Sequence, residues 1–200
     1  MGEPSRAAPR TLILASSSPR RRMLLEQAGY RFRVCAPDVH ERTKPAEKPA
    51  DAAQRLALEK GRAVAASCEV GSCVLAADTI VVLDGEVLGK PRDEPDALRM
   101  LLALSGRTHQ VLTGYALLAG GGRELQRGVA TSHVRMRAIA EQEAREYAAT
   151  RESLDKAGGY ALQGEAGRFV AAVEGARDNV IGLPLGELAA LLAAQGVTPE

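Results

Sequence analysis

Residues 11–28 read as a buried strand, a tight turn and a helix, and this unit narrows the choice of fold most. The apolar run TLILA (11–15) stops at three serines, and Pro19 follows Ser18. A serine side chain can cap a helix, and proline fixes φ for the first helical turn. We therefore predict a helix from Pro19 to Ala28. A strand that leads directly into a helix is the first half of a βα unit, which is typical of α/β folds.

The rest of the chain alternates between helical and strand patterns. Apolar spacing, caps and turn residues predict helices at 50–67, 93–104, 140–150 and 182–196, strands at 31–36, 73–77, 80–83 and 168–173, and a long antiparallel hairpin over 108–139. In this interpretation Asp78 ends the strand 73–77, and Asp84-Gly85 forms a hairpin turn. We predict an α/β protein with a mixed, twisted sheet and flanking helices. Residues 1–10 are expected to form a disordered leader and residues 11–200 a single domain.

The composition disfavours several classes of function. The 200 residues carry 26 basic and 25 acidic side chains, so the net charge is +1, and aromatic residues make up 3%. A nucleic-acid binder relies on a basic surface or on stacking aromatics, so neither DNA nor RNA is an expected partner. No apolar run approaches the roughly 18 residues of a membrane span, so no membrane partner is expected. Cys35, Cys68 and Cys73 form no CxxC pair, which favours a reduced, cytoplasmic protein.

Three arginines, Arg20, Arg21 and Arg22, directly follow Pro19 at the start of the predicted helix. The positive end of a helix dipole disfavours each cation there by about 0.3–1 kcal/mol. Free backbone N–H groups at such a turn bind anions, and guanidinium groups match phosphate oxygens in pairs. A polyphosphate bound at this turn would explain the arginines. The alternative is that they are solvated residues on the helix surface, paired with neighbouring acids.

Asp78, Glu41 and Lys60 are further candidates for chemistry. A carboxylate that follows an apolar strand, as Asp78 does, either has a structural partner or holds a cation such as Mg²⁺, and it can accept a proton from water. Glu41 lies in a polar loop, where it is either a second oxygen ligand or an ordinary surface residue. Lys60 shares the apolar face of the helix predicted at 50–67, from which it either snorkels to solvent or reaches into a cleft.

Lys90 and Gln163 lie in glycine-containing stretches that match no general nucleotide motif. GEVLGKP (85–91) is not a Walker A loop, because its glycines are one residue too close and Pro91 stands where Ser or Thr would bind magnesium. Lys90 is therefore either a phosphate contact or a residue of a turn. GGYALQG (158–164) lacks the GxGxxG spacing, although the Gln163 amide can pair with the edge of a base.

Six stretches together resemble the Maf family of nucleoside triphosphate pyrophosphatases. They occur in the family's order and cover about residues 11–190: LASSSPRR (14–21), RLALEKGRA (55–63), AADTIVVLDGEVLGKPRD (76–93), LSGRTHQVLTG (104–114), LDKAGGYALQG (154–164) and NVIGLPL (179–185). The resemblance implies a mixed α/β fold similar to inosine triphosphate pyrophosphatases, with two lobes around a cleft, and a homodimer. It also implies hydrolysis of a nucleoside triphosphate to the monophosphate and pyrophosphate with a divalent metal, either Mg²⁺ or Mn²⁺, with Co²⁺ as a further candidate.

The resemblance assigns roles to individual positions. Asp78 matches the family's proton acceptor and, together with Glu41, its metal-associated carboxylates. The positions that match phosphate contacts are Ser16, Arg21, Lys60 and Lys90. The positions that match substrate selection are Arg20, Thr79 and Gln163.

The stretch DKAGGYALQG (155–164) is similar to the branch of the family that acts on dTTP and UTP, and removal of modified nucleotides fits the same site. His40 departs from the family's pattern, because an acidic residue is common at its position, and this leaves the affinity for metal and the preferred metal open. Two alternatives stay open. One is a pyrophosphatase of the same family that acts on 7-methyl-GTP, and the other is a non-catalytic, nucleotide-binding regulator of cell division.

Overall fold

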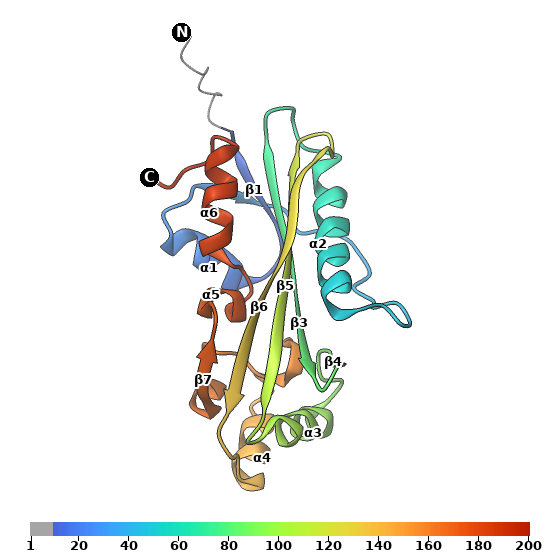
Figure 1. The fold of residues 1–200 in the computed structure, drawn as a ribbon, viewed down its shortest axis with the longest axis vertical. Helices are drawn as coiled ribbons and strands as arrows, with labels where there is room; N and C mark the ends of the chain where they lie inside the picture. Colours follow the sequence, from blue (N-terminus) through green and yellow to red (C-terminus); the bar gives the residue numbers. More distant parts are fainter. Residues whose placement is uncertain (1–9) are drawn as a thin grey trace.

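The computed structural model describes residues 10–200, which form a single seven-stranded sheet with helices on both faces (Figure 1). The strands are β1 (Leu12–Ala15), β2 (Phe32–Val34), β3 (Cys73–Leu83), β4 (Glu86–Leu88), β5 (Thr108–Ala119), β6 (Glu124–Met136) and β7 (Val170–Glu174). Their order is β2-β1-β3-β5-β6-β7, and β4 pairs with β3. β1 runs parallel to β2 and β3, and the other pairs are antiparallel. The predicted mixed α/β sheet is confirmed.

The predicted helices are also confirmed. They are α1 (Pro19–Gln27), α2 (Pro49–Ala65), α3 (Glu94–Leu104), α4 (Glu141–Ala149) and α6 (Leu185–Ala194). Sequence reasoning missed α5 (Arg177–Ile181), because five residues are too few to show a helical period. The leader predicted for residues 1–10 lies outside the described residues, apart from Arg10.

Local sequence signals explain where two of these elements begin and turn. The Ser18 side chain accepts a hydrogen bond from the backbone N–H of Arg21, and Pro19 opens α1, as the capping argument predicts. Asp84 and Gly85 both adopt a positive φ, 51° and 86°, which is the conformation of a two-residue hairpin between antiparallel strands. The hairpin between β3 and β4 is therefore confirmed.

The prediction that Asp78 ends a strand is wrong. β3 continues through Asp78 and Thr79, which pair with Gly114 and Thr113 of β5. The error arose because two polar residues interrupt the apolar run, and a buried strand was expected to be apolar throughout. Asp78 is nevertheless buried, with 6% of its surface exposed. A carboxylate is thus held in the middle of a central strand.

Helix α2 lies unusually close to this part of the sheet. A Cβ atom on Gly114 would come within 2.2 Å of the backbone of Ala53 in α2. A side chain at position 114 would therefore push the helix away from the sheet. Since Gly114 pairs directly with Asp78, the absent side chain lets α2 bring Lys60 to the same place.

The long strands β3, β5 and β6 join two lobes, which confirms the predicted arrangement (Figure 1). In one lobe, α1 and α6 cover the sheet around a core that includes Leu25, Leu75 and Leu188. In the other lobe, α3 and α4 contact each other beside a core that includes Leu101 and Tyr147. The two cores belong to different ends of the same strands, so the region between them is free to form a cleft.

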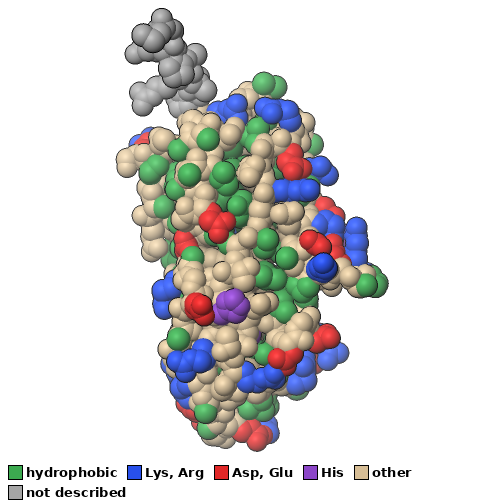
Figure 2. Space-filling model, viewed as in Figure 1, with side chains coloured by type: hydrophobic (Ala, Val, Ile, Leu, Met, Phe, Trp, Pro, Cys, Tyr) green, Lys and Arg blue, Asp and Glu red, His purple; other side chains and the backbone are tan. Residues whose placement is uncertain are grey.

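The molecular surface carries charge of both signs. On the face that Figure 2 shows, basic and acidic side chains are intermixed along the margins and over the lower half. Charge of one sign is therefore not gathered on this face. Within residues 10–200, no helix combines the length and the apolar character that crossing a membrane requires.

Candidate active site

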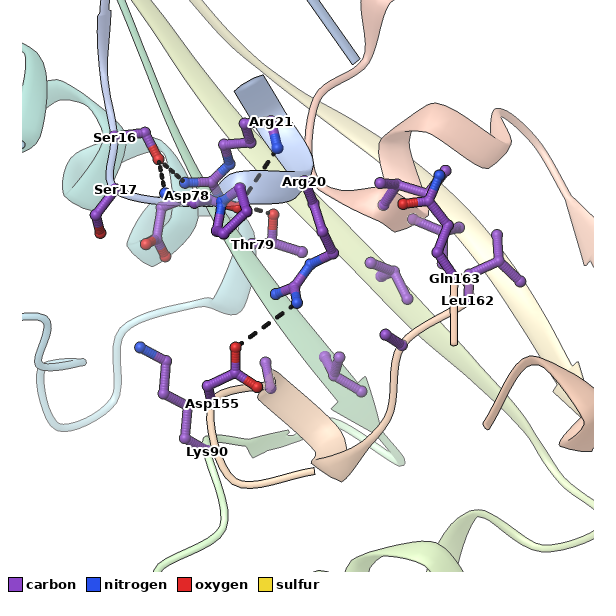
Figure 3. Close-up of a pocket in the computed structure, with 18 of the residues that line it drawn as sticks. Ser16, Ser17, Arg20, Arg21, Asp78, Thr79, Lys90, Asp155, Leu162 and Gln163 are labelled. Atoms are coloured by element: carbon purple, nitrogen blue, oxygen red, sulfur yellow. Dashed lines mark hydrogen bonds and ion pairs between the residues drawn. The ribbon is translucent and has the colours of Figure 1, made fainter. Parts of the chain in front are cut away.

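A cavity of about 280 Å³ opens between the two lobes (Figure 3). Its volume lies near the lower end of the range for small-molecule sites. Every site residue predicted from the sequence lines it: Ser16, Arg20, Arg21, Glu41, Lys60, Asp78, Thr79, Lys90 and Gln163. They come from the β1–α1 turn, the loop after β2, α2, β3, the segment after β4 and the loop before β7. The fold thus brings together residues that lie up to 147 positions apart in the chain, the separation of Ser16 and Gln163.

Arg21 is buried, and three segments hold its guanidinium group. Nε donates to the carbonyl oxygen of Gly182 at 2.8 Å, Nη1 to Ser16 Oγ at 3.2 Å and Nη2 to Thr79 Oγ1 at 3.1 Å. Burial lowers the pKa of Arg21, while the charges of Asp78 and Glu41 oppose that shift. All three acceptors are uncharged, so no carboxylate within residues 10–200 bonds directly to this cation. The arrangement favours an anion as a further partner.

Lys60 lies between two carboxylates. Its Nζ atom is 2.5 Å from Asp78 Oδ1 and 2.8 Å from Glu41 Oε1, and its side chain is only 5% exposed. Burial alone would raise the pKa of Glu41, but the hydrogen bond and charge of Lys60, with the charges of Lys90 and Arg21, lower it below its usual value. Glu41 is therefore ionised at neutral pH. This cluster brings a buried carboxylate, Asp78, and a more exposed one, Glu41, together in the cleft.

Four charged or polar residues at the rim of the cleft are more exposed. The Lys90 side chain is 59% exposed, and its Nζ lies 3.8 Å from Glu41 Oε2. Arg20 Nη1 lies 3.8 Å from Asp155 Oδ2 across the opening, as the dashed line in Figure 3 shows. Gln163 lies at the opposite side of the cavity from Lys90 (Figure 3). Exposed ion pairs at such distances contribute little stability, so these side chains are free to adjust to a ligand.

Apart from Glu41, which contacts both Lys60 and Lys90, these residues form two groups. Ser16, Arg21, Lys60, Asp78 and Thr79 are here called the anchored set, because side-chain hydrogen bonds to other parts of the protein hold each of them in place. Arg20, Lys90, Asp155 and Gln163 are called the exposed set. The division matters because the anchored set has a fixed geometry before any ligand binds.

Sequence reasoning missed Asp155 and the wall formed by α5. Asp155 lines the cavity and bonds to Lys156 Nζ at 2.6 Å. It lies in LDKAGGYALQG (154–164), where only the glycines and Gln163 carry a recognisable signal. Val180 and Ile181 line the cavity from α5, and the stretch NVIGLPL was the only signal for them. An apolar wall opposite charged groups suits a ligand with one flat apolar end and one charged end.

Comparisons with known proteins identify related chains. The chain is 53% identical over 192 residues to a dTTP/UTP pyrophosphatase of Anaeromyxobacter dehalogenans, which covers 94% of this chain and 95% of that one. It is 50% identical over 186 residues to a dTTP/UTP pyrophosphatase of Myxococcus xanthus, with 93% of each chain covered.

A solved structure resembles the fold. The structure of a HAM1 protein from Coxiella burnetii matches with a TM-score of 0.50 at 15% identity, over 92% of this chain and 99% of that one. At that identity the likeness concerns the fold alone. The family model described as Maf-like protein matches residues 11–195. The chain therefore belongs to the Maf family.

Proposed function

We propose that this protein hydrolyses dTTP or UTP to the nucleoside monophosphate and pyrophosphate. The observation that carries the proposal is the meeting of two cations, Arg21 and Lys90, with two carboxylates, Asp78 and Glu41, in one cleft. The cations suit a polyphosphate, and the carboxylates suit a proton acceptor and a metal ligand. Membership of the Maf family and relatives named dTTP/UTP pyrophosphatase support the reaction and the substrate class.

In the proposed reaction, water attacks the α-phosphorus. The new bond joins the water oxygen to that phosphorus, and the bond from phosphorus to the oxygen that bridges to the β-phosphate breaks. Asp78 accepts the proton of the attacking water. Arg21 and Lys90 neutralise the negative charge that grows on the phosphate oxygens and on the departing pyrophosphate. Such preorganised charge is the main source of rate in phosphoryl transfer.

Lys60 has a different role in this proposal from the phosphate contact that the family resemblance implies. Its Nζ is already committed to Asp78 Oδ1 and Glu41 Oε1. A lysine side chain between two carboxylates fixes their separation and orientation. Lys60 therefore prepares Asp78 as a proton acceptor, and Lys90, which is more than half exposed, is the lysine that meets the phosphates.

The donor set fits a divalent metal bound through oxygen. Glu41 and Asp78 offer two carboxylates, and Mg²⁺ commonly binds one or two carboxylates together with substrate phosphates. Within residues 10–200 no group of three or more potential metal-ligating side chains occurs, so the substrate would complete the coordination. The cavity wall carries four cationic and three anionic side chains, and a triphosphate would leave it strongly anionic. Mg²⁺ or Mn²⁺ would supply the missing positive charge and polarise the phosphate oxygens.

The choice of base is assigned to another part of the cavity wall. Gln163 can pair with the edge of a pyrimidine through its amide, while Val180 and Ile181 offer an apolar surface at the cavity wall. Arg20 lies between the phosphate-binding turn and the loop that carries Gln163 (Figure 3). His40 is exposed and does not line the described cavity, so its departure from the family's pattern need not disturb the carboxylate pair.

We further propose that residues 11–200 act as one domain and assemble as a homodimer. Three long strands cross both lobes, so we expect the lobes to unfold together in one transition. Sedimentation should give about twice the 21.1 kDa chain mass. A monomer, or two separate unfolding transitions, would contradict this part of the proposal.

The test of the reaction is a nucleotide panel. Purified protein with Mg²⁺ or Mn²⁺ should release pyrophosphate and monophosphate from dTTP and UTP and little from purine nucleotides. The Asp78→Asn variant should lose this release, whereas Asp84→Asn, the same substitution at an exposed turn of the same strand, should keep it. Pyrophosphate release from 7-methyl-GTP alone would identify that nucleotide as the substrate in place of dTTP and UTP. Nucleotide binding without any pyrophosphate release would favour a regulator over an enzyme.

A further inference from the structure

We propose that Thr113 and Asn179, two buried residues that do not line the cleft, are positioning residues that aim the Arg21 guanidinium at the substrate through Thr79. Both are completely buried, and neither is among the residues that line the cavity. Neither was a candidate from the sequence. The inference rests on the proposed function only in taking a phosphate group as the partner of Arg21.

A continuous line of hydrogen bonds connects the cleft to the core. Arg21 Nη2 donates to Thr79 Oγ1 at 3.1 Å, Thr79 Oγ1 lies 3.0 Å from Thr113 Oγ1, and Thr113 Oγ1 donates to the carbonyl oxygen of Asn179 at 3.0 Å. The line crosses α1, β3 and β5 and ends at α5. These four segments meet only through the tertiary fold.

The direction of every proton in this line is determined. A carbonyl oxygen can only accept a hydrogen bond, so Thr113 donates its single hydroxyl proton to the carbonyl oxygen of Asn179. Thr79 must therefore donate its own proton to Thr113. Thr79 Oγ1 can then only accept a hydrogen bond on its other side, where it accepts from the Arg21 guanidinium group. Thr79 consequently has no proton to donate to a substrate, which points to a role in orienting Arg21.

The far end of the line is fixed to the sheet. The Asn179 amide nitrogen donates to the carbonyl oxygen of Val111 at 3.1 Å and to Ser132 Oγ at 2.9 Å, which ties α5 to β5 and β6. The same segment ends at Gly182, whose carbonyl oxygen accepts from Arg21 Nε. Asn179 therefore sets the position of two of the three acceptors that hold Arg21.

The chemistry explains why these residues are neutral. A carboxylate bonded to Arg21 would hold it equally well, but would cancel the charge that a phosphate needs. Neutral acceptors fix the orientation of the guanidinium group and leave its charge for the ligand. Misalignment of the Arg21 charge weakens stabilisation of the transition state more than it weakens binding of the substrate. If Thr113 and Asn179 position Arg21, their removal should therefore lower kcat more than it raises KM.

The decisive experiment is a double-mutant cycle between Thr113→Val and Arg21→Ala. Valine keeps the size and branching of threonine and removes only the hydroxyl group. We expect Thr113→Val to lower kcat for dTTP about tenfold with little change in KM, and to have no further effect when Arg21 is already alanine. Tyr115→Phe removes a hydroxyl group from the same strand, one that bonds to Glu187 outside the line, and should leave kcat unchanged.

Two further measurements keep the result interpretable. Asn179→Ala is expected to lower kcat as well, with the melting temperature recorded because the residue is fully buried. Affinity for inorganic pyrophosphate is measured for all variants, so that positioning of Arg21 can be judged even if the wild-type protein hydrolyses no nucleotide. A lower kcat or weaker pyrophosphate binding in Thr113→Val, absent in the Arg21→Ala background, supports the inference. Equal losses in both backgrounds, or a Thr113→Val variant indistinguishable from wild type, would overturn it.

Discussion

Lys60 and Lys90 line the same cleft and yet belong to different kinds of structure. The Lys60 side chain is 5% exposed and is bonded to two carboxylates, whereas that of Lys90 is 59% exposed and lies 3.8 Å from one of them. The same contrast separates the whole anchored set from the exposed set. The core holds Asp78 and Arg21, which are expected to act on water and on the phosphates, whereas Lys90 and the groups expected to meet the base are more exposed.

This contrast follows from the way in which the chain builds the two sets. The anchored set comes from the central strand β3, from helices α1 and α2 packed on the sheet, and from the short turn between β1 and α1, where close packing allows little movement. The exposed set comes from an element terminus and from loops, which carry fewer contacts and adapt more readily. A site built in this way can hold the reacting geometry constant while it accommodates more than one base. Variants that act on one set alone can test the comparison.

The largest effect is expected at the centre of the anchored set. Asp78→Asn removes the proton acceptor and should lower kcat at least about 100-fold. Asparagine has nearly the same shape, so the fold should survive, although Lys60 then keeps only Glu41 as a carboxylate partner. Pyrophosphate release and circular dichroism measured on the same preparation would check both points. Activity within about threefold of wild type would remove Asp78 from the mechanism.

The two lysines give the most direct comparison between the sets. Lys90→Met should lower kcat/KM about 100-fold through a lost charge in the transition state, with no change in melting temperature because the residue is exposed. Lys60→Met should also lower the melting temperature, because it leaves the buried Asp78 carboxylate beside Glu41 without their shared cation. Methionine keeps the length of the side chain in both variants. Equal melting temperatures would break the comparison.

The sequence was sufficient to predict most elements and all nine site residues as members of one cleft. Periodicity and caps locate helices such as α1 and α3, because those signals are local. The sequence was not sufficient to show that β3 continues through Asp78. A charged residue inside a buried strand is tolerated only when another element supplies a partner, as α2 does with Lys60. The sequence also could not show Asp155 as a partner of Arg20, because ion pairs across a cleft depend on tertiary placement.

Thr79 and Gln163 sharpen the comparison at the level of substrate choice, where the expected effect is smaller. Thr79→Val should lower kcat/KM about tenfold for every nucleotide alike, because it disturbs the aim of Arg21. Gln163→Ala should change the ratio of kcat/KM among dTTP, UTP and other nucleotides by about tenfold, because it removes a contact to the base. Parallel kinetics on three nucleotides would check this. A changed ratio in Thr79→Val would return Thr79 to substrate selection.

The smallest effect on activity at neutral pH is expected from substitution of His109, a buried residue that contacts the loop carrying Gln163. Its Nε2 atom lies 2.6 Å from the hydroxyl oxygen of Tyr160, a residue that lines the cleft three positions before Gln163. Burial lowers the pKa of His109 from 6.5 to about 4. As the pH falls below 6.5, the unfolded chain therefore binds a proton that the folded protein does not, and the free energy of unfolding decreases until about pH 4.

The loss attributable to His109 is at most about 3 kcal/mol over this range. Melting temperatures of the wild type and of His109→Gln, measured between pH 6.5 and 5, separate this residue from the carboxylates, which titrate mostly at lower pH. The variant should show the shallower decline, and its kcat at pH 7.5 should stay within about threefold of wild type. Parallel declines in the two proteins would mean that another group carries the pH dependence. If kcat of the wild type falls between pH 6.5 and 5 together with its melting temperature, and kcat of His109→Gln does not, then the support of the Tyr160–Gln163 loop, and not the anchored set alone, sets the rate in mild acid.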